Sequence, residues 1–140
     1  MSSDEQFREQ LRDTYAGLAG ELSDTFEEAY RRLRLMPANR EVIETARRLA
    51  HNIKGTGASY GYKLISDIGA HMDARLKPYV DSGAAVPEAE LDHLDNCRKV
   101  LREAFGRIER REDDLSDLRE RFNEVAAEVG ERPSDGGNPS

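Results

Sequence analysis

His51 is the residue in this sequence whose neighbours best suit it to chemistry. Residues three and four positions apart share a face of a helix, which places Arg47, Arg48, Lys54 and Gly55 around it. On a helical wheel, His51 lies about 140° from the centre of the apolar side of its segment. We therefore expect its imidazole to point into solvent, where the neighbouring cations could steer an acidic partner.

An exposed imidazole of this kind can accept a phosphoryl group. Its unperturbed pKa is near 6.5, so at pH 7 a solvated histidine is largely neutral and its ring nitrogen is nucleophilic. Lys54, one turn further on, would stabilise the incoming negative charge. Gly55 and Gly57 remove bulk beside the ring, so a partner's active site could reach His51.

The remaining candidate ligands and nucleophiles favour structural roles. We expect His93 to be a solvated surface residue, His71 to be structural or at the surface, and Cys97 to fill the core. A metal-binding bundle built from His71, Asp73 and His93 is a distant alternative, because the Glu-x-x-His pairs of di-iron bundles are missing. One cysteine also excludes an internal disulfide and a multi-cysteine zinc site, so we predict no metal site.

The elements that must position these residues are helices. Apolar residues recur at three and four positions throughout, and no strand pattern is present. The fold class predicted is all-α, an antiparallel up-down four-helix bundle with a possible extra C-terminal helix. The expected helices cover roughly residues 4–35, 40–57, 62–82, 87–108 and 112–129.

Local signals set the expected breaks between these helices. Gly17 and Gly20 weaken the first helix and could bend it, whereas Gly55 and Gly57 would end the second. Asn39 is a plausible N-cap, because its side chain can accept a hydrogen bond from the first turn.

The chain divides into three parts by pattern. We predict a bundle domain over residues 1–111, an accessory amphipathic helix over 112–129 and a disordered tail over 130–140. The apolar stripe of 112–129 could pack on the bundle, pair with a second chain or remain frayed.

Composition and charge limit the classes of partner and the location that we expect for this protein. The chain has 140 residues and a formal net charge of −7 at pH 7, which suits one acidic domain and argues against duplex nucleic acid as a partner. Residues 31–54 depart from this balance, with seven basic and two acidic side chains. No apolar run approaches the roughly 18 residues that span a bilayer, and no secretion signal is visible. We therefore expect a cytoplasmic protein without membrane partners.

The sequence AHNIKGTGASYG at residues 50–61 resembles the signature of histidine-containing phosphotransfer (HPt) domains. That signature is H-x-x-K-G, followed by an aromatic or apolar residue and a glycine ten positions after the histidine. The chain is also similar to the phosphoacceptor domain of chemotaxis histidine kinases. The resemblance covers roughly residues 4–110, in the order of the helices and in the place of the histidine on the second one.

The resemblance implies a role for each matching residue. His51 would be the phosphoacceptor, attacking through the ring nitrogen remote from the backbone, and Lys54 would hold the phosphoryl oxygens. Gly55 would let a response-regulator receiver domain dock, and Gly61 would form the turn that opens the third helix. Asp73 falls where chemotaxis kinases use a glutamate to orient the other ring nitrogen.

The function predicted is that of a phosphocarrier in a two-component phosphorelay. Its partners would be a sensor histidine kinase and response-regulator receiver domains, and the Mg²⁺ of the transfer would sit in the receiver rather than in a cofactor site of its own. The sequence carries no ATP-binding or kinase motif. Two alternatives stay open: a phosphoacceptor domain of a chemotaxis-type kinase, and a helical adaptor that self-associates through 112–129.

Overall fold

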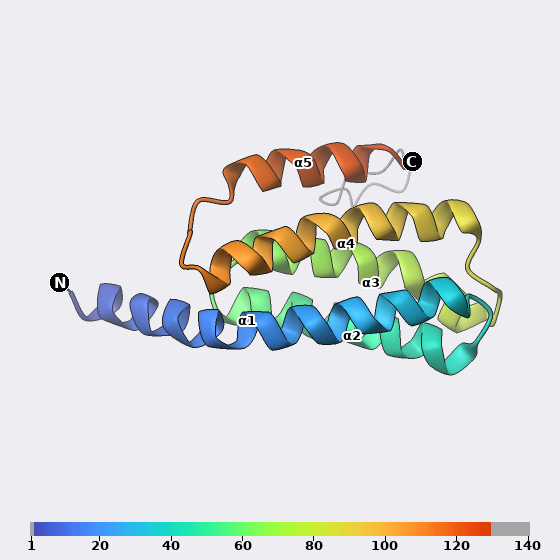
Figure 1. Cartoon of the computed structure of the whole chain (residues 1–140), viewed down its shortest axis with the longest axis horizontal. Helices are drawn as coiled ribbons and strands as arrows, with labels where there is room; N and C mark the ends of the chain where they lie inside the picture. The colour runs from blue at the N-terminus through green and yellow to red at the C-terminus, as the bar shows by residue number, and fades with distance from the viewer. Residues whose placement is uncertain (1, 130–140) are drawn as a thin grey trace.

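The computed structural model describes residues 2–129 and is built from helices, without strands in that range (Figure 1). The predicted all-α bundle is therefore confirmed. The helices are α1 (Ser3–Leu35), α2 (Arg40–Ser59), α3 (Lys63–Ser82), α4 (Glu88–Glu109) and α5 (Ser116–Ala127). Helices α2 and α3 form one antiparallel pair, α4 packs along α1, and α5 adds buried residues to the core that these four share.

Helix α1 begins at a capping box. The Ser2 side chain accepts a hydrogen bond from the Glu5 backbone N–H, and the Glu5 side chain returns to the Ser2 backbone. The helix continues through Gly17 and Gly20, so these glycines do not break it. Its first turns extend beyond the other helices in Figure 1, where Phe7 is 61% exposed.

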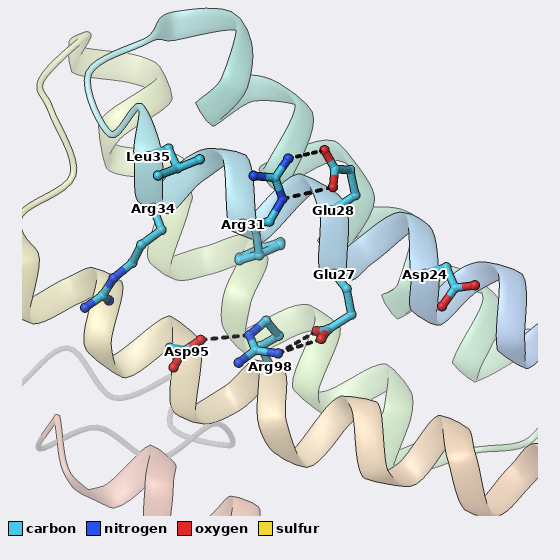
Figure 2. A pocket seen from close by; sticks show the side chains of 9 residues that line it. Asp24, Glu27, Glu28, Arg31, Arg34, Leu35, Asp95 and Arg98 are labelled. Atoms are coloured by element: carbon cyan, nitrogen blue, oxygen red, sulfur yellow. Dashed lines mark hydrogen bonds and ion pairs between the residues drawn. The ribbon is translucent and has the colours of Figure 1, made fainter.

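Helices α1 and α4 are joined by ion pairs as well as by the core. Figure 2 shows a pocket between them, lined mainly by charged side chains. Arg98 of α4 contacts Glu27 of α1 at 2.7 Å and Asp95 of its own helix at 2.7 Å. Arg31 pairs with Glu28 on α1. Of these ion pairs, Arg98–Glu27 joins the two helices, and the other two lie within one helix each.

Helix α2 begins as predicted but ends later. The Asn39 side chain accepts a hydrogen bond from the Val42 N–H at 3.0 Å, which confirms the N-cap. Gly55 and Gly57 lie inside the helix, so the expectation that they end it is wrong. The turn to α3 instead uses Gly61, whose φ of +85° lies in the left-handed region that favours glycine.

Helix α5 packs on the bundle, against α3 and α4. Leu118, Phe122 and Ala126 are each 0% exposed, so the apolar stripe of 112–129 is used within the chain. Of the three options for this stripe, the structure shows packing on the bundle, and self-association through 112–129 stays a prediction. The tail predicted over 130–140 lies outside the described residues. Within residues 2–129, no helix is long and apolar enough to cross a membrane.

Candidate functional site

His51 lies on the outer surface of α2, as its place on the helical wheel predicts. Its side chain is 62% exposed, and its Nδ1 atom lies 3.1 Å from Oδ2 of Asp73 on α3. An ionised carboxylate can only accept hydrogen bonds, so this contact places the ring proton on Nδ1. The Nε2 atom then keeps its lone pair, which is the state a nucleophilic imidazole needs.

Asp73 orients the His51 ring and is itself held in place by its surroundings. Its side chain is only 13% exposed, and its Oδ1 atom accepts a 2.7 Å hydrogen bond from Nε of Arg47. Burial acts to raise the pKa of the Asp73 carboxyl, but the hydrogen bonds from Arg47 and His51 outweigh it, and the net pKa is lowered. Asp73 therefore stays ionised and can hold the imidazole in one orientation.

The close approach of α2 and α3 depends on two glycines. A Cβ atom on Gly69 would lie 2.6 Å from the backbone N of Lys54 and 2.8 Å from the backbone O of Ala50, on either side of His51. A Cβ atom on Gly57 would lie 2.6 Å from the backbone N of Ser66. Neither side chain could fit without moving a helix backbone. The two glycines thus set the distance across which Asp73 reaches His51.

The positions of these two glycines correct the prediction for Gly57 and add Gly69 to the residues of the site. Gly57 is buried against α3, so it serves helix packing and does not clear space for a partner as expected. Gly69 was not predicted as a site residue. The available signal was a glycine in the middle of a helical pattern, one turn before Asp73, where glycine costs helix stability unless packing requires it.

The other predicted neighbours of His51 divide into two groups. Lys54, Gly55 and Arg48 are exposed beside it, and a Cβ atom on Gly55 would meet nothing within 4 Å. Lys54 and Arg48 form no ion pair with any residue in the described part of the chain. Arg47, in contrast, is half-buried and bound to Asp73, so its Nε supports the site rather than facing a partner.

An aromatic cluster fixes the end of α2 that follows the site. The Tyr15 hydroxyl lies 3.1 Å from Oγ1 of Thr56, and the Tyr15 ring stacks on Tyr60 at 4.9 Å and on Tyr62 at 5.4 Å between centroids. Because Tyr60 and Tyr62 flank Gly61, this stacking holds the turn into α3 against α1.

The two remaining histidines lie elsewhere. His71 of α3 and His93 of α4 are 6% and 5% exposed, with their Nε2 atoms 2.8 Å apart, so the prediction that His93 is solvated is wrong. Cys97 is buried as predicted, with Sγ 3.8 Å from Nε2 of His93. Asp73 faces His51 instead, so the alternative metal set of His71, Asp73 and His93 is not brought together.

Together, these features define a helical bundle that displays a histidine on its second helix, oriented by a carboxylate from its third. The sequence model of the Hpt domain family matches residues 5–129. The chain therefore belongs to the Hpt domain family, and the match extends through α5. Searches of curated proteins and of solved structures gave no match.

Proposed function

We propose that this protein is a histidine phosphotransfer protein that carries a phosphoryl group on His51 between partners of a two-component phosphorelay. The observation that supports this most directly is the exposed imidazole whose Nδ1 is held by Asp73 at 3.1 Å. Membership of the Hpt domain family points to the same role. We expect the exchange to take place in the cytoplasm.

The transfer begins with a receiver domain that carries an aspartyl phosphate. Nε2 of His51 attacks phosphorus, an N–P bond forms, and the P–O bond to the receiver's aspartate breaks with the carboxylate as leaving group. The ring becomes positively charged, and its Nδ1–H remains hydrogen-bonded to Asp73, which stabilises that charge. The reverse sequence delivers the phosphoryl group to a second receiver aspartate.

The exposed neighbours supply the rest of the site. Lys54, one turn beyond His51, is placed to attract the phosphoryl oxygens, and Gly55 leaves room for the edge of a receiver. Arg48 adds positive charge toward an acidic partner. The Mg²⁺ that neutralises charge in the transfer would be held by that receiver.

Acid-labile labelling from a panel of phosphorylated receiver domains tests the proposal. The chain should acquire label that is lost in acid, whereas His51→Gln should acquire none and keep the helical circular dichroism of the parent. A Gln variant that still accepts phosphate would contradict the assignment of His51. No transfer to the parent from any receiver or histidine kinase would contradict the proposed function itself.

One observation also favours a second candidate, the phosphoacceptor domain of a chemotaxis-type kinase. The carboxylate twenty-two positions after His51 contacts Nδ1, which is where the resemblance to those kinases places an orienting glutamate. An isolated chemotaxis kinase catalytic domain with ATP should then label His51 directly. Faster labelling by the kinase than by any phosphorylated receiver would favour this second function.

A further inference from the structure

A buried cluster of potential metal ligands lies at the junction of α3, α4 and α5. His71 comes from α3, whereas His93 and Cys97 are four residues apart on one face of α4. Phe122 of α5 packs edge-on against the His71 ring, with centroids 5.6 Å apart. The cluster therefore lies inside the protein and apart from the exposed His51.

The geometry of the cluster is close to that of a coordination site. The three candidate ligand atoms lie within 4.8 Å of one another, with 2.8 Å between the two Nε2 atoms and 3.8 Å from Nε2 of His93 to Sγ of Cys97. Tetrahedral coordination with Zn–N of about 2.0 Å and Zn–S of about 2.3 Å places ligand atoms roughly 3.3–3.6 Å apart. The two Nε2 atoms would separate by about half an ångström, and the remaining pair of ligand atoms, at most 4.8 Å apart, would close by up to roughly an ångström.

The structure assigns His71, His93 and Cys97 as a site for one thiolate-binding d¹⁰ metal ion, Zn²⁺ or Cu⁺. Two imidazole nitrogens and a thiolate suit these ions, whereas Mg²⁺ and Ca²⁺ prefer oxygen ligands. This site does not depend on the proposed phosphotransfer function, because none of its ligands touches His51 or Asp73 among the contacts described above.

Binding would redistribute two protons without any change of oxidation state. The Cys97 thiol loses its proton to solvent, and Sγ forms a bond to the metal. The hydrogen that lies between the two Nε2 atoms moves to Nδ1 of its own ring, so that both Nε2 lone pairs coordinate the ion. One proton is released for each ion bound.

Three charged side chains act on Cys97 through electrostatics, namely Arg75 of α3, Glu90 of α4 and Glu128, which follows the end of α5. Arg75 and Glu90 pair with each other through two hydrogen bonds of 2.8 and 2.7 Å. Their charges largely cancel, so Glu128 and the thiolate that Cys97 becomes on metal binding are the negative groups that favour a bound cation.

A bound ion would tie α3 to α4 beneath α5. Ligands that bind only the folded state stabilise it, so Zn²⁺ should raise the melting temperature of the full chain. This gain gives a readout that is separate from phosphotransfer.

The test uses the full chain with His51→Gln, so that His71 and His93 are its only histidines. Zn²⁺ and Cu⁺, the latter without oxygen, are each titrated against a chromophoric chelator. One ion per chain is expected for at least one metal, and Co²⁺ should give a thiolate-to-metal charge-transfer band. Absence of binding by both metals would overturn the proposal, as would a Co²⁺ spectrum without that band.

Variants in the same background identify the ligands. Cys97→Ser and His93→Gln should each weaken binding by more than about tenfold, because each removes one of three ligands. Val100→Ala is the matched control: it truncates a buried residue three positions after Cys97, keeps every ligand and should bind as the parent does. Equal metal affinity in Cys97→Ser and in the parent would overturn the site. If a variant fails to fold, the Co²⁺ spectrum of the parent still shows whether the Cys97 thiolate binds the metal.

Discussion

The contact between His51 and Asp73 shows how one residue can depend on the backbone beneath it. Asp73 is one methylene shorter than the glutamate implied by the resemblance to chemotaxis kinases, yet its Oδ2 lies 3.1 Å from Nδ1 of His51. We infer that Gly69 accounts for this reach, because it lets the backbone of α3 approach α2 beside His51.

Replacing Asp73 with asparagine should slow phosphotransfer without unfolding the bundle. Asparagine keeps the size of the side chain but loses the charge that favours a proton on Nδ1 and stabilises the charged ring. We expect the transfer rate to fall by at least about tenfold, the loss seen when a carboxylate that orients a metal-bound histidine is removed. Single-turnover transfer from one phosphorylated receiver measures this rate.

Arg47→Gln serves as the comparison, because it removes the second partner of Asp73 and leaves the carboxylate on His51. This variant should lose less activity than Asp73→Asn. An Asp73→Asn variant that transfers phosphate as fast as the parent would contradict the orienting role.

At the scale of the element, the packing of α2 on α3 should respond sharply to one added methyl group. Gly69→Ala places a Cβ 2.6 Å from the Lys54 backbone, so the helices must separate or shift. We expect a loss of about 1–3 kcal/mol in the free energy of unfolding, typical of overpacking, and slower transfer as Asp73 moves from His51. Urea denaturation and the transfer assay measure the two effects.

Gly17→Ala is the matched control for this change. Gly17 lies within α1, and a Cβ there meets nothing within 4 Å, so alanine should stabilise the fold by up to about 1 kcal/mol through helix propensity. If Gly69→Ala also stabilised the protein, the close contact between α2 and α3 would be contradicted.

Helix α5 should prove part of the fold rather than an appendage. Phe122 is 0% exposed and contacts His71, so Phe122→Ala would leave a cavity between α5 and α3. We expect a loss of about 3–5 kcal/mol in the free energy of unfolding, measured by urea denaturation. Arg121→Ala, on the exposed side, should cost under about 1 kcal/mol because its ion pair with Glu103 lies at the surface.

Sedimentation of the same proteins addresses assembly. The parent, Phe122→Ala and Arg121→Ala should share one oligomeric state, since the stripe of α5 is buried within its own chain. A small effect of Phe122→Ala on stability, together with a change of oligomeric state, would contradict the packing described above.

The helices could be predicted from sequence because a 3.6-residue apolar period is a local property. The exposure of His51 follows from the same period. The pairing of His71 with His93 could not be predicted from sequence, because it depends on the register between α3 and α4, which no local pattern encodes. The role of Gly57 was misjudged for a related reason: a glycine at a helix end and a glycine at a helix crossing look alike in one sequence.

At the scale of the whole molecule, folding changes the meaning of the charge pattern. Residues 31–54 hold seven cations, but Arg31, Arg34, Arg40 and Arg47 are in ion pairs. Part of the acidic start of α1 is likewise paired, since Glu9 and Asp13 contact Arg111. Of the three cations outside these ion pairs, Arg32 lies near the end of α1, whereas Arg48 and Lys54 lie beside His51.

The raised pKa values of the buried tyrosines lead us to expect that the fold loses stability at high pH. Burial raises the pKa of Tyr15 and of Tyr62 to about 12, and burial also raises that of Tyr30. A raised folded pKa favours the neutral phenol, so this stabilisation is complete below pH 10 and is lost as pH rises through 12. In an alkaline titration, the tyrosinate absorbance of these residues should therefore appear at a pH well above 10, together with loss of helical circular dichroism.

Two comparisons test this response. In urea the same phenols should ionise near pH 10, and Tyr15→Phe should remove one late phenol from the titration of the folded protein. Ionisation of all five tyrosines near pH 10 with the helices intact would contradict the burial of these rings.

The position of α5 also makes it a suitable site for attaching a fluorescent label. It packs on α3 and α4 and does not contact α2, and Asn123 lies on its exposed side. Because the native thiol of Cys97 is buried, Asn123→Cys would give the chain a single accessible thiol for a fluorophore. Such a probe would report partner binding by anisotropy while leaving the surface around His51 unobstructed.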